Sequence, residues 1–209
     1  MIIHSDKVDT ITACAIYAMM IAQKENDNSR VYKYSDNWQS AKSDEPIAII
    51  AHGDEFSAGS LNADQLMFHL RKILPQNYKG TIKFISCLTG KYMSDLDPIA
   101  NEIFSRLKKE KYRNFTITAP KGPLIVYVNS EGKISKTVLN PSTTMDYSCF
   151  ENELHLMNAE KLFKVELKNV DFESCRQIHT KASPYLAYLE KLYVKADVVL
   201  SNKPFIVLQ

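Results

Sequence analysis

The sequence predicts an α/β fold: a mostly parallel β-sheet with helices on both faces, followed by a C-terminal hairpin and helical extension. Through residue 119, short apolar runs typical of strands alternate with segments whose apolar residues recur at helical intervals. Two of these runs, 47–51 and 82–85, are almost wholly aliphatic, as expected in a sheet covered on both faces. With 209 residues, of which 45% are hydrophobic, the chain can bury one sizeable core.

We expect residues 1–140 to form the α/β core, and residues 141–209 to pack on it as an extension, within the same domain. The first short strand is predicted at 2–4. A helix follows at 8–23, for which Asp6 or Asp9 serves as the N-cap. The apolar part of that helix superficially resembles a signal peptide. Aspartates precede it and it is far shorter than a membrane span, so we interpret it as a buried helix.

The remaining elements follow from apolar periodicity and from turn residues. Residues 54–60 read as an exposed loop, and residues 61–74 as a helix with Asn62 as its cap. Pro98 falls in the first turn of a helix at 95–109, a position that suits proline. The other predicted strands lie at 31–34, 47–51, 81–86, 115–119, 124–128, 133–139, 163–167, 197–200 and 205–208, and the other helices at 172–181 and 184–195.

The charge distribution does not favour nucleic-acid binding. The net charge is +2, but residues 1–70 are net acidic and residues 71–121 net basic. The basic side chains of 71–121 are mostly spread over predicted helix surfaces, and no glycine-rich or aromatic RNA-binding signature accompanies them. A solvated helix face explains them, and we predict no nucleic-acid partner.

The four cysteines form no CxxC pair or regular framework, which argues against a disulfide scaffold and suits a reducing compartment. Cys175 and His179 have the i, i+4 spacing of two metal ligands, but no further ligand has convincing spacing. We therefore predict no metal site.

Two strand ends carry the most informative residues. His52 follows the apolar run 47–51, and Cys87 follows the run 82–85 after Ser86. In an open parallel sheet, side chains just past the carboxyl ends of neighbouring strands converge on one crevice. A cysteine nucleophile needs a base to supply thiolate near neutral pH, and histidine is the usual base. The sequence therefore predicts a catalytic pair of His52 and Cys87.

Three further residues follow His52. Gly53 has no side chain, so its N–H and that of Cys87 are candidates for an oxyanion hole. Asp54 and Glu55 either recognise a basic substrate side chain or only solvate the loop. Trp38, the one tryptophan, is either a partly buried anchor or a substrate contact.

A hydrophobic strand ending in His-Gly, then a helix, then a hydrophobic strand ending in a small residue and Cys resembles the clan CD cysteine peptidases. That clan includes caspases, gingipains, separases, CHAT-domain proteases and the self-cleaving domains of large bacterial toxins. The resemblance covers about residues 46–120. The caspase signature Gln-Ala-Cys-x-Gly is absent, and the interval of 35 residues between His52 and Cys87 is shorter than the roughly 50 of caspases.

The resemblance implies a caspase-like core and a cysteine endopeptidase that cleaves a protein or peptide substrate, or itself. It implies attack by Cys87, proton transfer through His52, and substrate lying between the two. No cofactor is required, although an inositol phosphate activates some toxin relatives through a basic flap. It also implies a bacterial effector or virulence protease, either cytoplasmic or secreted into a host cytosol.

Other functions compete with this one. The fold can persist as a catalytically inactive binding module in which the His–Cys pair is residual. A different α/β hydrolase or transferase is weakened because the chain has no GxSxG elbow, and a nucleotide-binding protein because it has no Walker-A loop or GxGxxG fingerprint. The sequence leaves the oligomeric state open.

Overall fold

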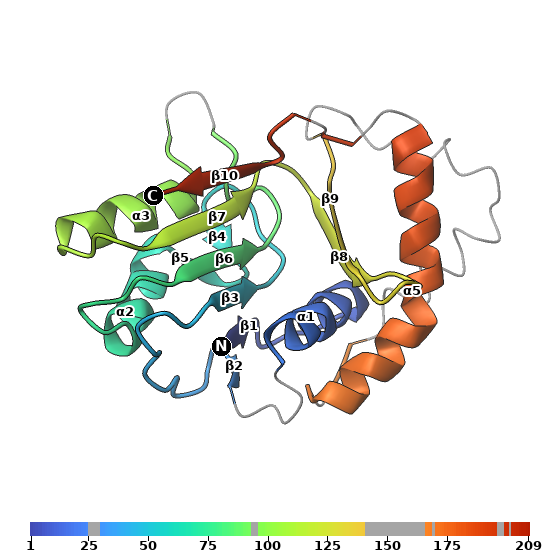
Figure 1. Ribbon diagram of the computed structural model, residues 1–209, viewed down its shortest axis with the longest axis horizontal. Helices are drawn as coiled ribbons and strands as arrows, with labels where there is room; N and C mark the ends of the chain where they lie inside the picture. The colour runs from blue at the N-terminus through green and yellow to red at the C-terminus, as the bar shows by residue number, and fades with distance from the viewer. Residues whose placement is uncertain (25–29, 93–95, 141–165, 169, 196–198, 201) are drawn as a thin grey trace.

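The structure is a computed structural model that describes all residues except 25–29, 93–95, 141–165, 169, 196–198 and 201. Its centre is a six-stranded sheet in the order β10-β7-β6-β3-β1-β2 (Figure 1). All neighbouring pairs within it are parallel except β10 and β7. The predicted α/β class with a mostly parallel sheet is therefore confirmed. The strands of this sheet are β1 (Ile2–His4), β2 (Val31–Lys33), β3 (Ile47–Ile50), β6 (Thr81–Ile85), β7 (Thr116–Pro120) and β10 (Phe205–Leu208).

Helices cover both faces of the sheet, as predicted (Figure 1). Side chains alternate along a strand, so Ile49 and Phe84 pack toward α2 and α3, whereas Ile50 and Ile85 pack toward α1. The hairpin of β8 and β9 lies on the α1 side, and α5 packs against α1 and β8. The bounds are α1 (Thr10–Gln23), α2 (Ala63–Ile73), α3 (Ile99–Lys109), α5 (Phe172–Lys195), β8 (Leu124–Val128) and β9 (Ile134–Val138).

Helix α1 is the buried helix that the sequence predicts. Asp9 is its N-cap, and the Asp9 carboxylate accepts a hydrogen bond of 2.8 Å from the Thr12 amide. This cap decides between the two aspartates considered above. Of the helices in the described part of the chain, none is long and apolar enough to cross a membrane.

The prediction of an exposed loop at 54–60 is wrong. Strand β4 (Ser57–Ala58) pairs with β5 (Leu61–Asn62) in a small hairpin, and Ala58 is fully buried. Because β5 occupies residues 61–62, helix α2 begins at Ala63, two residues later than predicted. Asn62 caps it as expected, in a reciprocal capping box with Gln65.

Two other helix predictions need correction. Helix α3 begins at Ile99 instead of residue 95, because Pro98 is its N-cap and a residue before proline disfavours helical geometry. The helices predicted at 172–181 and 184–195 are one helix, α5, with Pro184 inside it. Proline removes one backbone donor and bends a helix without always ending it, and Figure 1 shows α5 changing direction along its length.

The C-terminal strand completes the sheet. Strand β10 pairs antiparallel with β7, so residues beyond 141 contribute an edge strand to the core. The predicted strands at 163–167 and 197–200 lie partly outside the described residues, although Val199 bridges to Leu139.

Trp38 is a buried anchor, since it is 7% exposed and its indole donates to the Lys33 carbonyl.

Candidate functional site

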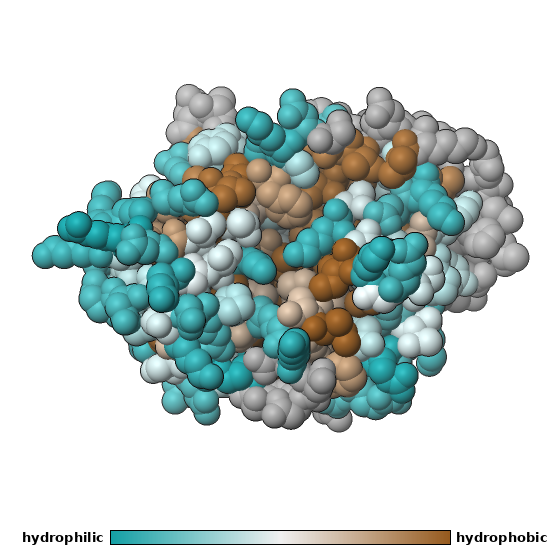
Figure 2. All heavy atoms as spheres, viewed as in Figure 1, coloured by the Kyte–Doolittle hydropathy of each residue, from teal (hydrophilic) through white to brown (hydrophobic). Residues whose placement is uncertain are grey.

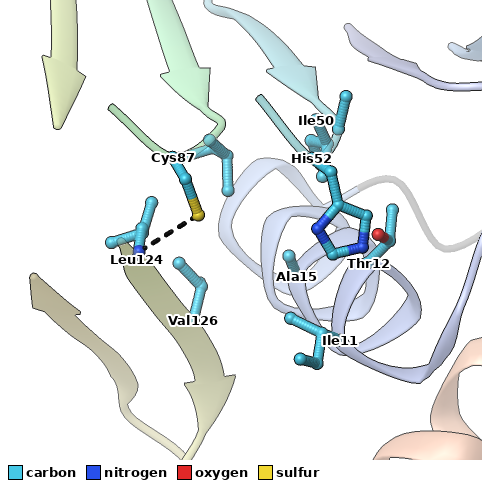
Figure 3. A pocket seen from close by; sticks show the side chains of 10 residues that line it. Ile11, Thr12, Ala15, Ile50, His52, Cys87, Leu124 and Val126 are labelled. Atoms are coloured by element: carbon cyan, nitrogen blue, oxygen red, sulfur yellow. Dashed lines mark hydrogen bonds between the residues drawn. The ribbon is translucent and has the colours of Figure 1, made fainter. Parts of the chain in front are cut away.

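His52 and Cys87 lie at matching positions on neighbouring strands. Strands β3 and β6 pair in parallel with Ile50 opposite Ile85, and each candidate residue follows two positions later. Because side chains alternate along a strand, His52 and Cys87 lie on the same face of the sheet as Ile50 and Ile85, which is the face covered by α1. Figure 3 shows their side chains on the walls of one pocket.

The pocket is a small hollow between three elements. The ends of β3 and β6 form one side, the first turns of α1 form the second, and β8 forms the third (Figure 3). Its volume is about 20 Å³, which is room for one water molecule. A small group fits inside, whereas a larger ligand must lie partly across the surface. The lining residues are Ile11, Thr12, Ala15, Ile50, Ala51, His52, Ile85, Cys87, Leu124 and Val126.

His52 is oriented by a carboxylate. Its Nε2 lies 2.6 Å from Oδ2 of Asp9, and its side chain is 61% exposed. The hydrogen bond to Asp9 raises the pKa of His52 above its ordinary value, despite some desolvation. For Asp9, desolvation by burial is outweighed by hydrogen bonds with His52 and the Thr12 amide, so its pKa is lowered. The folded state therefore favours an ionised carboxylate beside a readily protonated imidazole.

This pair predicts a pH dependence of stability. The raised pKa of His52 stabilises the fold fully below its unfolded pKa of about 6.5, and that contribution is lost as the pH rises through the folded value. The lowered pKa of Asp9 stabilises the fold above its unfolded value of about 3.9, and is lost in more acid solution. Both contributions are present between these limits.

We therefore expect His52→Ala to lower the free energy of unfolding more at pH 5.5 than at pH 8.5. The difference stays below about 1 kcal/mol because the pair is partly solvated. Urea denaturation at the two pH values measures it. An equal or larger loss at pH 8.5 would show that the ion pair contributes no pH-dependent stability.

Cys87 is a partly buried thiol that faces the same pocket. Burial raises its pKa, and hydrogen bonds from the Leu124 amide, 3.3 Å from Sγ, and from its own amide offset this in part. Cys14 and Cys175 are fully buried and burial raises the pKa of each to about 12. Of the described cysteines, Cys87 is the one in contact with the pocket, and at neutral pH it needs a base to become a nucleophile.

The turn after Cys87 is held in a strained but well-fixed conformation. Leu88 has φ of +61°, in the left-handed region that costs a branched residue roughly 1–2 kcal/mol. Its amide donates to the Gly122 carbonyl, and the Thr89 hydroxyl donates to the Ser86 carbonyl over 2.9 Å. These contacts fix the direction in which Cys87 leaves the sheet, and strain of this kind often occurs at functional sites.

Gly53 packs directly against the Ser86-Cys87 segment. The backbone on either side of it pairs with the β4 strand: Gly59 N–H donates to the His52 carbonyl, and Asp54 N–H to the Ser57 carbonyl. Within the described ranges, neither the Gly53 N–H nor the Cys87 N–H donates to another residue. The Cys87 N–H also contacts its own Sγ. The oxyanion-hole role of the two amides stays a prediction.

Replacing Gly53 by alanine is expected to destabilise the protein. The new Cβ would lie 2.1 Å from Ser86 Oγ and 2.8 Å from the Ser57 carbonyl oxygen, so the backbone must move. Such overpacking costs about 1–3 kcal/mol. Gly132→Ala is the control, because a Cβ there meets nothing within 4 Å and only the positive φ is strained. Urea denaturation compares the two variants, and equal losses would contradict the close packing at Gly53.

The two acidic residues after Gly53 have partners inside the protein. Oδ1 of Asp54 accepts hydrogen bonds from the amides of Phe56 and Ser57, and Glu55 forms an ion pair of 3.3 Å with Lys91. These contacts favour the structural alternative for both carboxylates, and their role in substrate binding stays a prediction.

The remaining candidates also have structural roles. Cys175 is buried, and His179 Nε2 accepts a hydrogen bond of 3.0 Å from the Val128 amide. No group of three or more metal-ligating side chains occurs among the residues described. In the basic segment, Arg71 pairs with Glu110, and Arg106 with Asp64 and Glu102, so these arginines are already neutralised.

Comparison of the chain with protein-family models and with curated proteins gives no match.

Two parts of the site are not predicted from the sequence. The sequence predicts only a helix-cap role for Asp9, yet Asp9 also binds His52. The position of Asp9 after the first predicted strand is a signal for this contact. It is not sufficient, because the sequence does not show that β1 lies beside β3. Leu124 and Val126 of the predicted hairpin line the pocket, and no motif marks them.

Proposed function

We propose that this protein is a cysteine peptidase that uses His52 and Cys87 to hydrolyse a peptide bond in a protein substrate or in itself. The observation that carries the proposal is the matched placement of the two residues: neighbouring parallel strands, the same register, the same face and one pocket. An accidental pair has no reason to satisfy all four conditions. The resemblance to clan CD peptidases depends on the same two strand ends.

The reaction follows from the chemistry of these groups. His52 takes the proton from the Cys87 thiol, and Sγ attacks the carbonyl carbon of the peptide bond. The carbonyl oxygen becomes an oxyanion, which the amides of Gly53 and Cys87 stabilise. The imidazolium of His52 then protonates the leaving amine, and the C–N bond breaks to leave a thioester. Water, deprotonated by His52, hydrolyses the thioester and regenerates the thiol.

At rest, each of the two residues bonds to another group of the protein. His52 is bonded to Asp9, and Cys87 accepts from Leu124. A carbonyl group entering the pocket mouth would lie between the imidazole and the sulfur, as the resemblance implies. A long resting separation does not prevent catalysis in such an arrangement.

A catalytically inactive, caspase-like binding module is the second candidate. The observation in its favour is the raised pKa of the partly buried Cys87 thiol, which lowers the thiolate fraction at rest. The two functions differ in what they require of the thiol. A peptidase needs a reactive Cys87 that depends on His52, whereas a binding module needs neither.

The test is cleavage of a peptide library and of candidate protein substrates, read by mass spectrometry. The intact mass of the chain itself is followed in the same samples, so that self-processing is detected. Cleavage by the wild-type protein that disappears in Cys87→Ala supports the proposal. Cleavage that persists in that variant refutes it.

The location implied by the resemblance, the cytoplasm or a host cytosol reached as a secreted effector, belongs to the same proposal. Regulation by inositol phosphate receives less support, because the basic residues Arg71 and Arg106 are paired with carboxylates. A melting-temperature shift with inositol hexakisphosphate would restore that hypothesis.

A further inference from the structure

A third strand end contributes to the site. Strand β1 has β2 on one side and β3 on the other, so the strand order reverses between β1 and β3. Ligands of open α/β sheets bind outside the carboxyl ends of the strands at such a point. Asp9 comes five residues after β1 ends, and its Oδ2 lies 2.6 Å from Nε2 of His52.

We propose that Asp9 is the positioning residue of a three-membered site, Asp9–His52–Cys87, and that it holds His52 in the tautomer that can deprotonate Cys87. This inference rests on the proposed peptidase function, and it goes beyond the His–Cys pair that the sequence predicts.

The hydrogen bond determines which ring nitrogen does the chemistry. A carboxylate only accepts, so in the neutral imidazole the proton lies on Nε2, and Nδ1 carries the lone pair. Figure 3 shows one ring nitrogen directed toward Thr12 in the first turn of α1, the helix that Asp9 caps, and the other toward the side of the pocket that holds Cys87. The nitrogen that Asp9 leaves unprotonated is thus the one available to the thiol or the leaving amine.

The capping role of Asp9 keeps this carboxylate charged and fixed. One oxygen accepts from the Thr12 amide at the N-terminus of α1, where the helix dipole stabilises an anion. The backbone of Val8 and Asp9 is also held, since Leu167 N–H donates to the Val8 carbonyl and Asp9 bridges to Glu166. Asp9 therefore reaches His52 from a rigid support.

Among the described residues, the titratable groups that the structure brings to His52 are Asp9, which bonds to its ring, and Cys87, which lines the same pocket. The Asp9–His52 pair is partly exposed to solvent. Loss of the carboxylate should therefore cost less than in a fully buried triad, about tenfold to a hundredfold in kcat.

Two variants separate positioning from capping. Asp9→Asn keeps a good N-cap but removes the charge, and Asp9→Ser keeps a cap that is too short to reach His52. Asn62→Ser is the matched control, because it changes the cap of α2, which packs on the face of the sheet opposite to α1. The measurements are kcat and KM as functions of pH, the melting temperature, and the pKa of His52 from its imidazole C–H resonances in NMR.

We expect both Asp9 variants to lose kcat with little change in KM, to fold normally, and to move the pKa of His52 from its raised value toward about 6.5. Asn62→Ser should change neither kcat nor this pKa. An unchanged His52 titration in Asp9→Asn overturns the inference, and so does a wild-type kcat in that variant.

The two proposals fail differently. If cleavage persists in Cys87→Ala, the peptidase function fails, while the NMR titration still reports whether Asp9 controls His52. If Cys87→Ala is inactive but Asp9→Asn retains the wild-type pH profile, the peptidase stands and the third member does not.

Discussion

Cys87→Ala is expected to abolish peptide cleavage, with kcat/KM lowered by on the order of 10⁴-fold or more. Removing the nucleophile prevents the thioester from forming, and such losses in enzymes of this type reach 10⁴–10⁶. The fold should be retained, because Cys87 is partly exposed and its thiol makes one weak hydrogen bond to another residue, the Leu124 amide. The measurement is kcat/KM on a substrate from the peptide library, together with the free energy of unfolding.

Cys175→Ala is the matched control for that experiment. Cys175 is fully buried against α1, so its removal leaves a small cavity and lowers stability. It does not line the pocket. We expect a lower melting temperature with unchanged kcat/KM, the opposite of Cys87→Ala. Loss of kcat/KM in Cys175→Ala with unchanged kcat/KM in Cys87→Ala would show that Cys87 is not the nucleophile.

His52→Ala is expected to lower kcat/KM by about 10²–10⁴, the usual contribution of a positioned general base. The burial that raises the pKa of the Cys87 thiol makes this base more necessary, since little thiolate forms without it. His52 is 61% exposed, so its removal opens a space that solvent can enter. Added imidazole should therefore restore part of the activity, in proportion to its unprotonated fraction.

His69→Ala is the control for this substitution. His69 is half-buried on α2, where its ring stacks on Trp38, on the opposite face of the sheet. It should leave both kcat/KM and the response to imidazole unchanged. If His52→Ala retains activity within a factor of three of wild type, His52 is not the base.

The central part of the site could be predicted from the sequence because it depends on local signals. An aliphatic run marks a buried strand, and His52 and Cys87 follow such runs at equal distances from the last paired residues. The carboxyl ends of parallel strands meet at one edge, so the convergence of these residues needed no further information. By contrast, the hydrogen bonds of the backbone on either side of Gly53 depend on the β4–β5 hairpin, which apolar periodicity did not predict. The Gly53 amide itself takes no part in these bonds.

The remaining features depend on contacts between distant segments. The bond from Asp9 to His52 requires that β1 lie beside β3, and strand order is a tertiary property. Helix α5 continues through Pro184 because it packs along α1 and β8, and packing can offset the cost of a lost backbone hydrogen bond. Local patterns alone predict a break there.

Activation of the Cys87 thiol by His52 across the pocket is the central step of the proposed function. Labelling with an acyloxymethyl-ketone probe tests it without knowledge of the substrate, if the modified peptide is identified by mass and the rates are compared in wild type and His52→Ala. We predict that Cys87 is labelled preferentially, that the buried Cys14 and Cys175 are not, and that the rate falls at least tenfold in His52→Ala. Equal labelling of Cys87 with and without His52 would contradict the claim.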